Sequence, residues 1–332
     1  MRESFEMNYF VGGDVGGTKT HVVIADEEGC IAGFGHSGGG NHETVGFEGF
    51  ARVVGEAFNQ AVVTADISID QISGAGFGIG GYDWESQRKD HVKALSKLGI
   101  KAPIEIVNDA ILGLLAGSEA GWGIAVVSGT GCNCWGWDKE RKHIGRMTGL
   151  GTLMGEGAGA SELIHKAAQA VSHEWSKRGK ATALTPAFIK QTGAKDLNDF
   201  IEGYSLGRLD LGPAAAPLVF TAAEAGDEIA QSLIRWAGTE LGEMVNAVAR
   251  QLDFQDLDFD VILIGSMFQN GPALTQPMGE TIHSVSPGAY LKRLTFPPVA
   301  GGVILAMKVA NQAPAASVRS SLLTSISKLY TK

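Results

Sequence analysis

The sequence predicts an α/β protein of two lobes, each a mixed β-sheet with flanking helices. Two observations carry this prediction. Three strands, with a glycine turn between the first two, follow one another over 11–35, and the same order of parts returns over 121–145. Apolar residues at helical spacing follow each copy. We therefore expect an internal duplication, with a domain boundary at 117/118, beside the glycines of 117–121.

The first lobe, 1–117, opens with strands predicted over 10–15, 19–26 and 30–35. A helix over 44–65, a glycine-rich strand at 71–81, a helix over 83–98 and a buried strand at 104–107 follow. The second lobe, 118–312, has its duplicated strands first, then a mostly helical stretch over 160–250 and a buried strand at 259–265. Helices are predicted over 301–309 and 320–330, and 313–332 is expected to pack back on the first lobe.

Composition excludes several classes of function. The chain has 332 residues and a formal net charge of −9, which argues against nucleic acid or an anionic membrane as partner. No apolar run reaches about 18 residues, so no membrane span is expected. The N-terminus lacks the apolar core of a signal peptide, and three cysteines fit a reducing cytoplasm. Cys132 and Cys134 form a C-x-C, but no second ligand pair lies at metal spacing, so two half-buried thiols are favoured.

The first glycine turn has the chemistry of an anion cradle. Gly16, Gly17, Thr18 and Lys19 provide backbone N–H groups, a hydroxyl and a positive charge. The P-loop pattern fails because Thr18 separates Gly17 from Lys19, and a strand follows instead of a helix. Asp14 leads into the turn, where a carboxylate can hold Mg²⁺ through water. The alternative interpretation is a plain glycine hairpin with a solvated Asp.

The second copy repeats this turn at 128–133, where Gly129 and Gly131 permit close approach and Thr130 offers a hydroxyl. Two such hairpins facing each other across a cleft would hold a polyphosphate from both sides. Asp109 follows a buried strand, at the end where open α/β sheets place ligands. A carboxylate there can accept a proton from an attacking hydroxyl, although Asp is equally suited to cap the next helix.

Three further glycine segments have two interpretations each. In GGGNH, Asn41 suits sugar hydroxyls or a helix cap. In GLGTLMGEGAG, Glu156 is the only charge, and it either contacts a substrate or metal or favours the helix dipole. GFGIGG at 76–81 fits G-x-G-x-x-G, but no acid stands about 20 residues further on. A glycine strand lining a cleft is therefore favoured over a dinucleotide site.

Taken in order, these motifs resemble the sugar kinase/Hsp70/actin superfamily. Within it they are most similar to the N-acetylglucosamine kinase branch, which shares a domain family with the BadF/BadG/BcrA/BcrD ATPases. GGDVGGTKT and SGTGCNC resemble the phosphate motifs, GGGNH the sugar loop and VNDAILG the catalytic segment. GLGTLMGEG resembles the family's Gly-Trp-Gly loop, ILIGSM the adenosine motif and PPVAGGVILA the C-terminal Gly-Gly segment. The resemblance covers 12 to about 306 and implies a ribonuclease H-like, actin-like ATPase fold with a central cleft.

The resemblance implies a cytoplasmic, homodimeric enzyme that uses ATP and Mg²⁺ to phosphorylate an amino sugar, first of all N-acetylglucosamine at its 6-hydroxyl. It implies that Asp109 is the general base and that Asp14 lies near Mg²⁺. The residues implied to bind the sugar are Asn41, His42, Asn133, Gly149, Leu150, Gly151 and Glu156. Those implied to bind ATP are Gly16, Gly17, Thr18, Lys19, Gly129, Thr130, Gly131, Gly265, Ser266 and Asn270.

Three departures from the family pattern fall on the sugar side. Leu150 replaces a Trp, Cys132 replaces a Ser, and Glu156 stands in Gly-Glu-Gly-Ala where the family has Gly-Asp-Glu-Gly. ATP use is therefore better supported than the sugar, and glucosamine or N-acetylmuramic acid stay open. The alternatives are a sugar sensor and an ATPase that activates a partner enzyme. Such activators hold an iron–sulfur cluster between subunits, and Cys132 and Cys134 lie in the wrong place for it.

Overall fold

The computed structural model describes residues 7–151 and 154–330, which fall into two compact units. The first unit comprises the chain up to Ala125, Trp137–Lys142 and the chain from Lys292 onward; the second comprises Val126–Gly136 and His143–Leu291. This division differs from the expected one over 118–125, 137–142 and 292–312, all of which the sequence assigned to the second lobe. The largest difference is the segment 292–312. The contacts assign this segment to the first unit because helix α10 (Val299–Val309) packs on strands of the first sheet.

The first sheet has the strand order β3-β2-β1-β4-β5. Its strands are β1 (Tyr9–Val15), β2 (Lys19–Asp26), β3 (Ile31–Gly38), β4 (Ile72–Ile79) and β5 (Ile104–Asn108). The β1 strand pairs antiparallel with β2 and parallel with β4, and β4 pairs parallel with β5. The sheet is therefore mixed, and the carboxyl ends of β1, β4 and β5 lie at one edge.

The second sheet has the order β8-β7-β6-β9-β10. Each of its strands comes five strands later in the chain than the strand at the same place in the first sheet. Its strands are β6 (Gly123–Ser128), β7 (Cys132–Trp137), β8 (Ile144–Met147), β9 (Phe259–Ile264) and β10 (Ala289–Arg293). The repetition confirms the predicted duplication and the predicted class of two mixed sheets with flanking helices. Strand β10 was not predicted.

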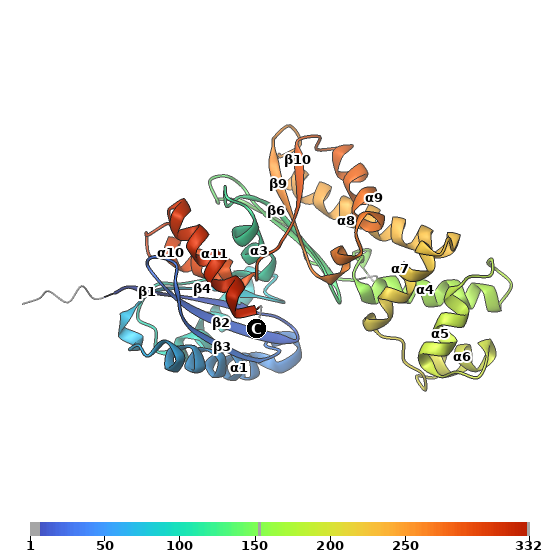
Figure 1. The fold of residues 1–332 in the computed structure, drawn as a ribbon, viewed down its shortest axis with the longest axis horizontal. Helices are drawn as coiled ribbons and strands as arrows, with labels where there is room; N and C mark the ends of the chain where they lie inside the picture. Colours follow the sequence, from blue (N-terminus) through green and yellow to red (C-terminus); the bar gives the residue numbers. More distant parts are fainter. Residues whose placement is uncertain (1–6, 152–153, 331–332) are drawn as a thin grey trace, which may run out of the picture. The chain divides into compact units, whose positions relative to one another are not determined.

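Two helices cover opposite faces of the first sheet (Figure 1). Helix α1 (His42–Ala65) packs so closely on β3 that its backbone occupies the space where Gly33 would carry a side chain. Helix α10 packs in the same way on Gly12 and Gly76. Val11, the neighbour of Gly12, joins the apolar core with residues of α1, and successive strand residues point to opposite faces. The glycines of β1, β3 and β4 thus permit two layers of helix to approach one sheet.

The other helices of the first unit are α2 (Arg88–Leu95), α3 (Asp109–Gly117) and α11 (Ala316–Tyr330). The α2 helix is shorter than the predicted 83–98 because one-turn 3₁₀ segments, Glu85–Gln87 and Ser96–Leu98, flank it. The α11 helix lies against the start of β3, where Ser325 Oγ accepts a hydrogen bond from Ile31 N at 3.1 Å. The C-terminal helix thereby belongs to the first unit.

Helices of the second unit are α4 (Ala160–Trp175), α5 (Leu184–Thr192), α6 (Leu197–Ser205), α7 (Ala216–Glu224), α8 (Glu228–Gln251) and α9 (Pro272–His283). The long α8 packs on β8 and on α9. A Cβ at Gly238 would lie 2.6 Å from Leu274 O, so glycine is what permits the two helices to touch. Within the described ranges, no helix is both long and apolar enough to cross a bilayer.

Candidate functional site

The predicted phosphate turn of the first unit is tightly bonded. Gly16 N donates to Lys19 O at 2.9 Å, and Gly40 N donates to Gly16 O at the same distance. The backbone of Gly17 fills the space where Gly39 would carry a side chain. The turn 16–19 and the loop 38–40 that precedes Asn41 are therefore packed directly together. Two predicted motifs, one for phosphate and one for sugar, become neighbours.

Asp14 and Asp109 lie at the same edge of the first sheet. Asp14 is near the end of β1 and pairs with Gly78 of β4, whereas Asp109 directly follows Asn108, the last residue of β5. Burial and, after it, the charge of Asp109 raise the pKa of Asp14 to about 7, although the charge of Lys19 opposes both effects. The two carboxylates are therefore close enough to repel one another.

Asn108, and not Asp109, is the N-cap of the helix that Asp109 begins. Its side chain is the N-cap of α3, because Asn108 Oδ1 accepts a hydrogen bond from Ala110 N at 3.0 Å. Its Nδ2 donates to Tyr82 O at 3.3 Å and to Asp83 Oδ1 at 3.1 Å. Since Asn108 already caps the helix, Asp109 is not required for that role. Sequence reasoning missed Asn108, although an N-cap residue directly before a candidate base was a usable signal.

Gly80 and Gly81 bring Asn41 and Asp109 to one place. A Cβ at Gly80 would lie 3.3 Å from Asp109 Oδ2, and one at Gly81 would lie 2.6 Å from Asn41 Oδ1. The two adjacent glycines thus touch both polar side chains. Asn41 is also the N-cap of α1, with Oδ1 accepting from Glu43 N at 2.8 Å. The glycines 80 and 81 of GFGIGG serve this site, whereas Gly76 packs on α10.

His42, predicted to bind sugar, lies among aromatic rings. Its ring stacks on Phe47 with centroids 4.8 Å apart and meets the edge of His91 at 4.6 Å. His42 Nε2 lies 3.2 Å from Gln87 Nε2. Burial lowers the pKa of both histidines, so neutral rings are favoured. The His42 ring thereby anchors the start of α1, next to Asn41.

The second phosphate turn is held by the start of a helix. Gly129 N donates to Gly131 O at 2.9 Å, and the first residues of α4 donate back to the turn, from Ala160 N to Gly129 O at 2.8 Å and from Ser161 N to Thr130 O at 3.0 Å. The α4 amino end therefore directs two of its backbone N–H groups into the turn itself.

The end of β9 crosses the same turn. Gly265 has a φ of +113°, and the carbonyl of Ser128 occupies the space where Gly265 would carry a side chain. Ser266 and Asn270 follow in the 3₁₀ segment Ser266–Asn270, where Asn270 Nδ2 donates to Met267 O at 3.0 Å. The predicted adenosine residues thus begin directly beside the predicted phosphate turn of this unit.

Glu156 organises its loop. Its Oε2 accepts hydrogen bonds from Gly149 N at 2.7 Å and from Leu150 N at 3.0 Å. Gly149 has a φ of +76°, and Cys132 O fills the space of its missing side chain. This carboxylate therefore fixes Gly149, Leu150 and Gly151 against β7. The described part of this loop stops at 151 and resumes at 154.

Asn133 presents a buried acceptor. Its Oδ1 has no hydrogen-bond partner among the residues that the structure describes. The neighbouring thiols do not compete for that role, because Cys132 Sγ accepts from Ala158 N at 3.1 Å and burial raises the pKa of Cys132 to about 11. Burial also raises the pKa of Cys134. Asn133 is thus suited to a polar ligand, and both thiols stay protonated.

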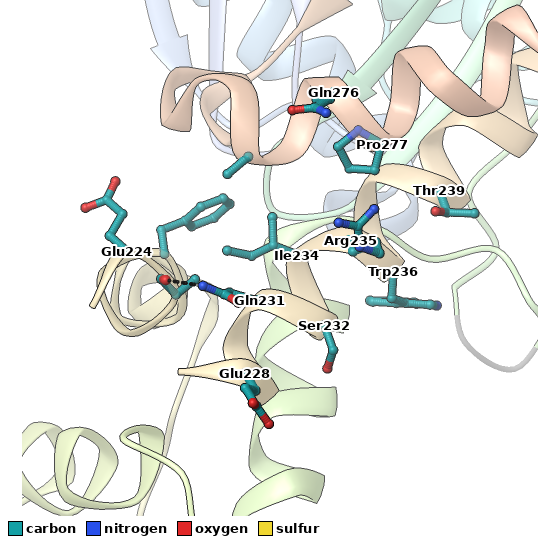
Figure 2. Close-up of a pocket in the computed structure, with 13 residues that line it drawn as sticks. Glu224, Glu228, Gln231, Ser232, Ile234, Arg235, Trp236, Thr239, Gln276 and Pro277 are labelled. Atoms are coloured by element: carbon teal, nitrogen blue, oxygen red, sulfur yellow. Dashed lines mark hydrogen bonds between the residues drawn. The ribbon is translucent and has the colours of Figure 1, made fainter. Parts of the chain in front are cut away.

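A separate pocket of about 740 Å³ lies between α7, α8 and α9 (Figure 2). Its lining combines apolar residues such as Phe220, Ile234 and Pro277 with polar ones such as Arg235 and Gln276. None of the residues predicted to bind ATP or sugar lines it.

The sequence profile described as the BadF/BadG/BcrA/BcrD ATPase family matches residues 11–303. A Clostridium acetobutylicum protein named N-acetylmuramic acid/N-acetylglucosamine kinase is 27% identical over 267 residues, covering 80% of this chain and 87% of its own length. A Dictyostelium discoideum protein named N-acetyl-D-glucosamine kinase is 26% identical over 313 residues, covering 90% and 97%. A ROK family glucokinase from Streptomyces griseus, solved with glucose and AMPPNP, aligns with a TM-score of 0.57 at 16% identity, covering 91% of this chain and 99% of its own.

Proposed function

The chain belongs to the BadF/BadG/BcrA/BcrD ATPase family, and we propose that within it the protein is an ATP-dependent kinase that phosphorylates N-acetylglucosamine at its 6-hydroxyl. Two relatives whose names include N-acetylglucosamine kinase match 80% and 90% of the chain. The observation that carries the proposal is the meeting of Asn41 and Asp109 over Gly80 and Gly81. A hydrogen-bonding amide and a carboxylate at one point are what sugar phosphorylation requires.

Asp109 acts as the general base in this proposal. Its carboxylate accepts the proton of the attacking sugar hydroxyl as the new oxygen–phosphorus bond forms, and ADP leaves with the electrons of the bond that breaks. Asn108 caps α3, and its Nδ2 donates to the backbone oxygen of Tyr82 and to the side chain of Asp83. These bonds fix the start of the helix that carries Asp109. The base is thereby oriented before substrate arrives.

The two glycine turns bind the phosphates of ATP. Gly16, Gly17, Thr18 and Lys19 serve in the first unit, and the turn 129–131 serves in the second. Lys19 supplies positive charge where the transferred phosphoryl group gains negative charge. Gly265, Ser266 and Asn270 contact adenosine, since Gly265 lies directly on Ser128, beside the second turn.

A magnesium ion fits the acidic edge of the first sheet. Asp14 and Asp109 are hard oxygen donors, and the charge of Asp109 raises the pKa of a buried Asp14, a repulsion that a divalent cation relieves. Asp14 would hold the ion through water. When bound, Mg²⁺ supplies charge neutralisation for the phosphates of ATP.

The sugar contacts come from both units. The residues assigned to the acceptor are Asn41 and His42 in the first unit. In the second unit they are Asn133, with its unpartnered Oδ1, and the loop Gly149, Leu150 and Gly151 fixed by Glu156. Leu150 is 46% exposed, which leaves an apolar side chain available to a substrate. Because one relative is named for N-acetylmuramic acid as well, that sugar is the second candidate acceptor.

A panel assay tests the proposal. Purified protein with Mg·ATP is given N-acetylglucosamine, N-acetylmuramic acid, glucosamine or glucose, and ADP release and product mass are measured. We expect N-acetylglucosamine to be used best and its 6-phosphate to form. Asp109→Asn is expected to lower kcat by about 10²–10⁴-fold while ATP binding persists. The matched control is Asp90→Asn, an exposed residue of α2. Full activity in the Asp109 variant, or ATP turnover independent of sugar, would refute the assignment.

We also infer a cytoplasmic homodimer, as the family resemblance implies. Sedimentation equilibrium of the purified protein tests the dimer. A single species at the monomer mass of 34.8 kDa across the concentration range would contradict it.

A further inference from the structure

Three cationic side chains from distant parts of the sequence converge in the first unit. Arg141 comes from the turn between β7 and β8, Lys308 from the end of α10 and Arg319 from α11, and all three are half-buried. The charges of both arginines act on Lys308. None of these residues belongs to the site proposed above. Three cations packed together are unexpected in a chain with a net charge of −9, because like charges repel.

The two arginines are fixed by backbone carbonyls. Arg319 donates from Nη1 to Leu115 O and from Nη2 to Ala116 O, both at 2.7 Å, at the carboxyl end of α3. Helix carboxyl ends carry partial negative charge, so this contact is favourable. Arg141 Nε donates to Gly121 O at 3.2 Å. Both guanidinium groups keep further N–H donors beyond these bonds.

Lys308 has no such partner. Among the residues that the structure describes, no hydrogen bond or ion pair reaches its ammonium group. The point where a Cβ of Gly121 would stand lies 3.0 Å from Lys308 Nζ and 2.8 Å from Arg141 Nη2. Two cationic donors therefore converge over a glycine. Burial and, after it, the positive charges of Arg141 and Arg319 together lower the pKa of Lys308 to about 8.

The backbone on both sides of this point is unusual. Gly121 has a φ of +67°, and Arg141 has a φ of +57°, a conformation uncommon for residues with side chains. The Arg141 turn is held by its N–H, which donates to Asp138 O at 3.0 Å, and by Lys142 N, which donates to Asp138 Oδ1 at 2.7 Å. These bonds hold the Arg141 backbone in the left-handed region, and from there its side chain reaches Gly121.

We propose that Arg141, Lys308 and Arg319 bind a compact oxyanion of the phosphoryl type. Partly buried cations are costly without a counter-charge, and three of them match a dianion better than a single carboxylate. Arginine offers phosphate a planar pair of donors, and lysine adds a point charge. Burial lowers the pKa of Arg319, and the charge of the exposed Glu119 opposes this only in part, with no hydrogen bond between the two among the described residues. Arg141, Lys308 and Arg319 all remain partly exposed, so a small ligand from solution can reach them.

The test compares phosphate binding by full-length variants. Calorimetric titration with inorganic phosphate, at matched ionic strength set with chloride, is run on wild type, Lys308→Gln and Lys328→Gln. Lys328 is an exposed lysine of α11, so its variant changes the net charge equally. Lys308→Gln is expected to weaken phosphate binding about tenfold, as expected for losing one charge-assisted hydrogen bond, and Lys328→Gln is expected to leave it unchanged.

Two more measurements make the outcome decisive. In phosphate-free buffer, Lys308→Gln should melt at a higher temperature than wild type, because repulsion from both arginines is removed. In saturating phosphate, wild type should melt at the higher temperature. Arg141→Gln is the second variant and should weaken phosphate binding by a similar factor. Titration with glycerol 3-phosphate distinguishes a phosphate ester from the free ion as the natural ligand. Equal phosphate affinity in wild type, Lys308→Gln, Arg141→Gln and Lys328→Gln would overturn the proposal and leave the cluster a cap for α3.

Discussion

Gly81 lies directly against the Asn41 amide, and we expect Gly81→Ala to damage sugar use more than it damages stability. Gly81 has a φ of +82°, and a Cβ there would lie 2.6 Å from Asn41 Oδ1 and 2.9 Å from Nδ2. Ordinary contacts between such atoms are about 3.5–4.0 Å, so the amide must move by roughly 1 Å. The Asn41 amide therefore leaves the position from which it caps α1 and is proposed to hold the sugar.

The magnitude follows from two separate effects. A left-handed Ala costs about 1–2 kcal/mol of folding stability relative to Gly. A displacement of about 1 Å in a positioning group costs up to about 100-fold in rate. Since Asn41 is proposed to hold the sugar in the ground state and in the transition state alike, the loss should appear mainly as a higher KM for sugar, by about 10- to 100-fold. The KM for ATP should stay near its original value.

Gly99→Ala is the matched control. Gly99 has a φ of +75°, but no atom lies within 4 Å of the position of its Cβ. In urea, Gly81→Ala should lose the free energy of unfolding that Gly99→Ala loses, plus about 1 kcal/mol for the displaced cap of α1. Steady-state kinetics should detect a changed sugar KM in Gly81→Ala alone. The reasoning about Asn41 fails if Gly81→Ala retains the original KM for sugar, or if both variants raise it equally.

Three further substitutions test other parts of the structure. Glu156→Ala removes the acceptor of Gly149 N and Leu150 N, so faster amide exchange at both positions and a higher KM for sugar are expected. Gly302→Ala places a Cβ 2.9 Å from Gly12 Cα and should lower the free energy of unfolding by about 1–3 kcal/mol through overpacking. Asp227→Ala removes the N-cap of α8 and should cost about 1 kcal/mol at pH 7. Burial alone would raise the pKa of Asp227, but hydrogen bonds hold it below its ordinary value, so its contribution exists above about pH 4 and is lost as the pH falls.

Each of these substitutions has its own check. Glu156→Gln keeps one acceptor oxygen and should retain part of the exchange protection; full protection in Glu156→Ala would contradict the assigned role. The control for Gly302→Ala is Gly55→Ala, in α1, where no atom lies within 4 Å of the Cβ position. This control should stabilise the protein by up to about 1 kcal/mol. If it instead lost as much free energy of unfolding as Gly302→Ala, overpacking would not explain the loss in Gly302→Ala. The unfolding free energy of Asp227→Ala should fall less steeply below pH 5 than that of wild type, and parallel curves would disprove the linkage.

Much of the architecture could be predicted because its signals are local. Alternating apolar residues and glycine turns predict the hairpins β1–β2 and β6–β7, and their repetition predicts two similar sheets. The end of a buried strand predicts a ligand-binding position at Asp109. The sequence alone could not distinguish a base from a helix cap there, because both roles favour the same residue type at the same place. The hydrogen bond from Ala110 N to Asn108 assigns the cap to Asn108, and the role of Asp109 as base stays a prediction.

The remaining features depend on contacts between distant segments. Strand β10 and helix α9 escaped prediction because neither carries a strong periodic pattern, and their neighbours in the fold stabilise them. The role of Glu156 was equally hidden, since a carboxylate that accepts backbone N–H groups and one that faces a ligand have the same sequence signal. The cluster of Arg141, Lys308 and Arg319 has no sequence signal at all.

The sequence by itself determined the duplicated hairpins, the glycine turns and the acidic positions at strand ends, because turn chemistry and periodicity act over a few neighbouring residues. Only the tertiary structure decided that α10 belongs to the first sheet, that Gly80 and Gly81 join Asn41 to Asp109, and that Arg141 and Lys308 meet at Gly121 within reach of the charge of Arg319. These outcomes depend on burial and close packing between segments far apart in the chain. The free energy of such a contact arises only when both segments pack together, so neither segment's own sequence reveals it.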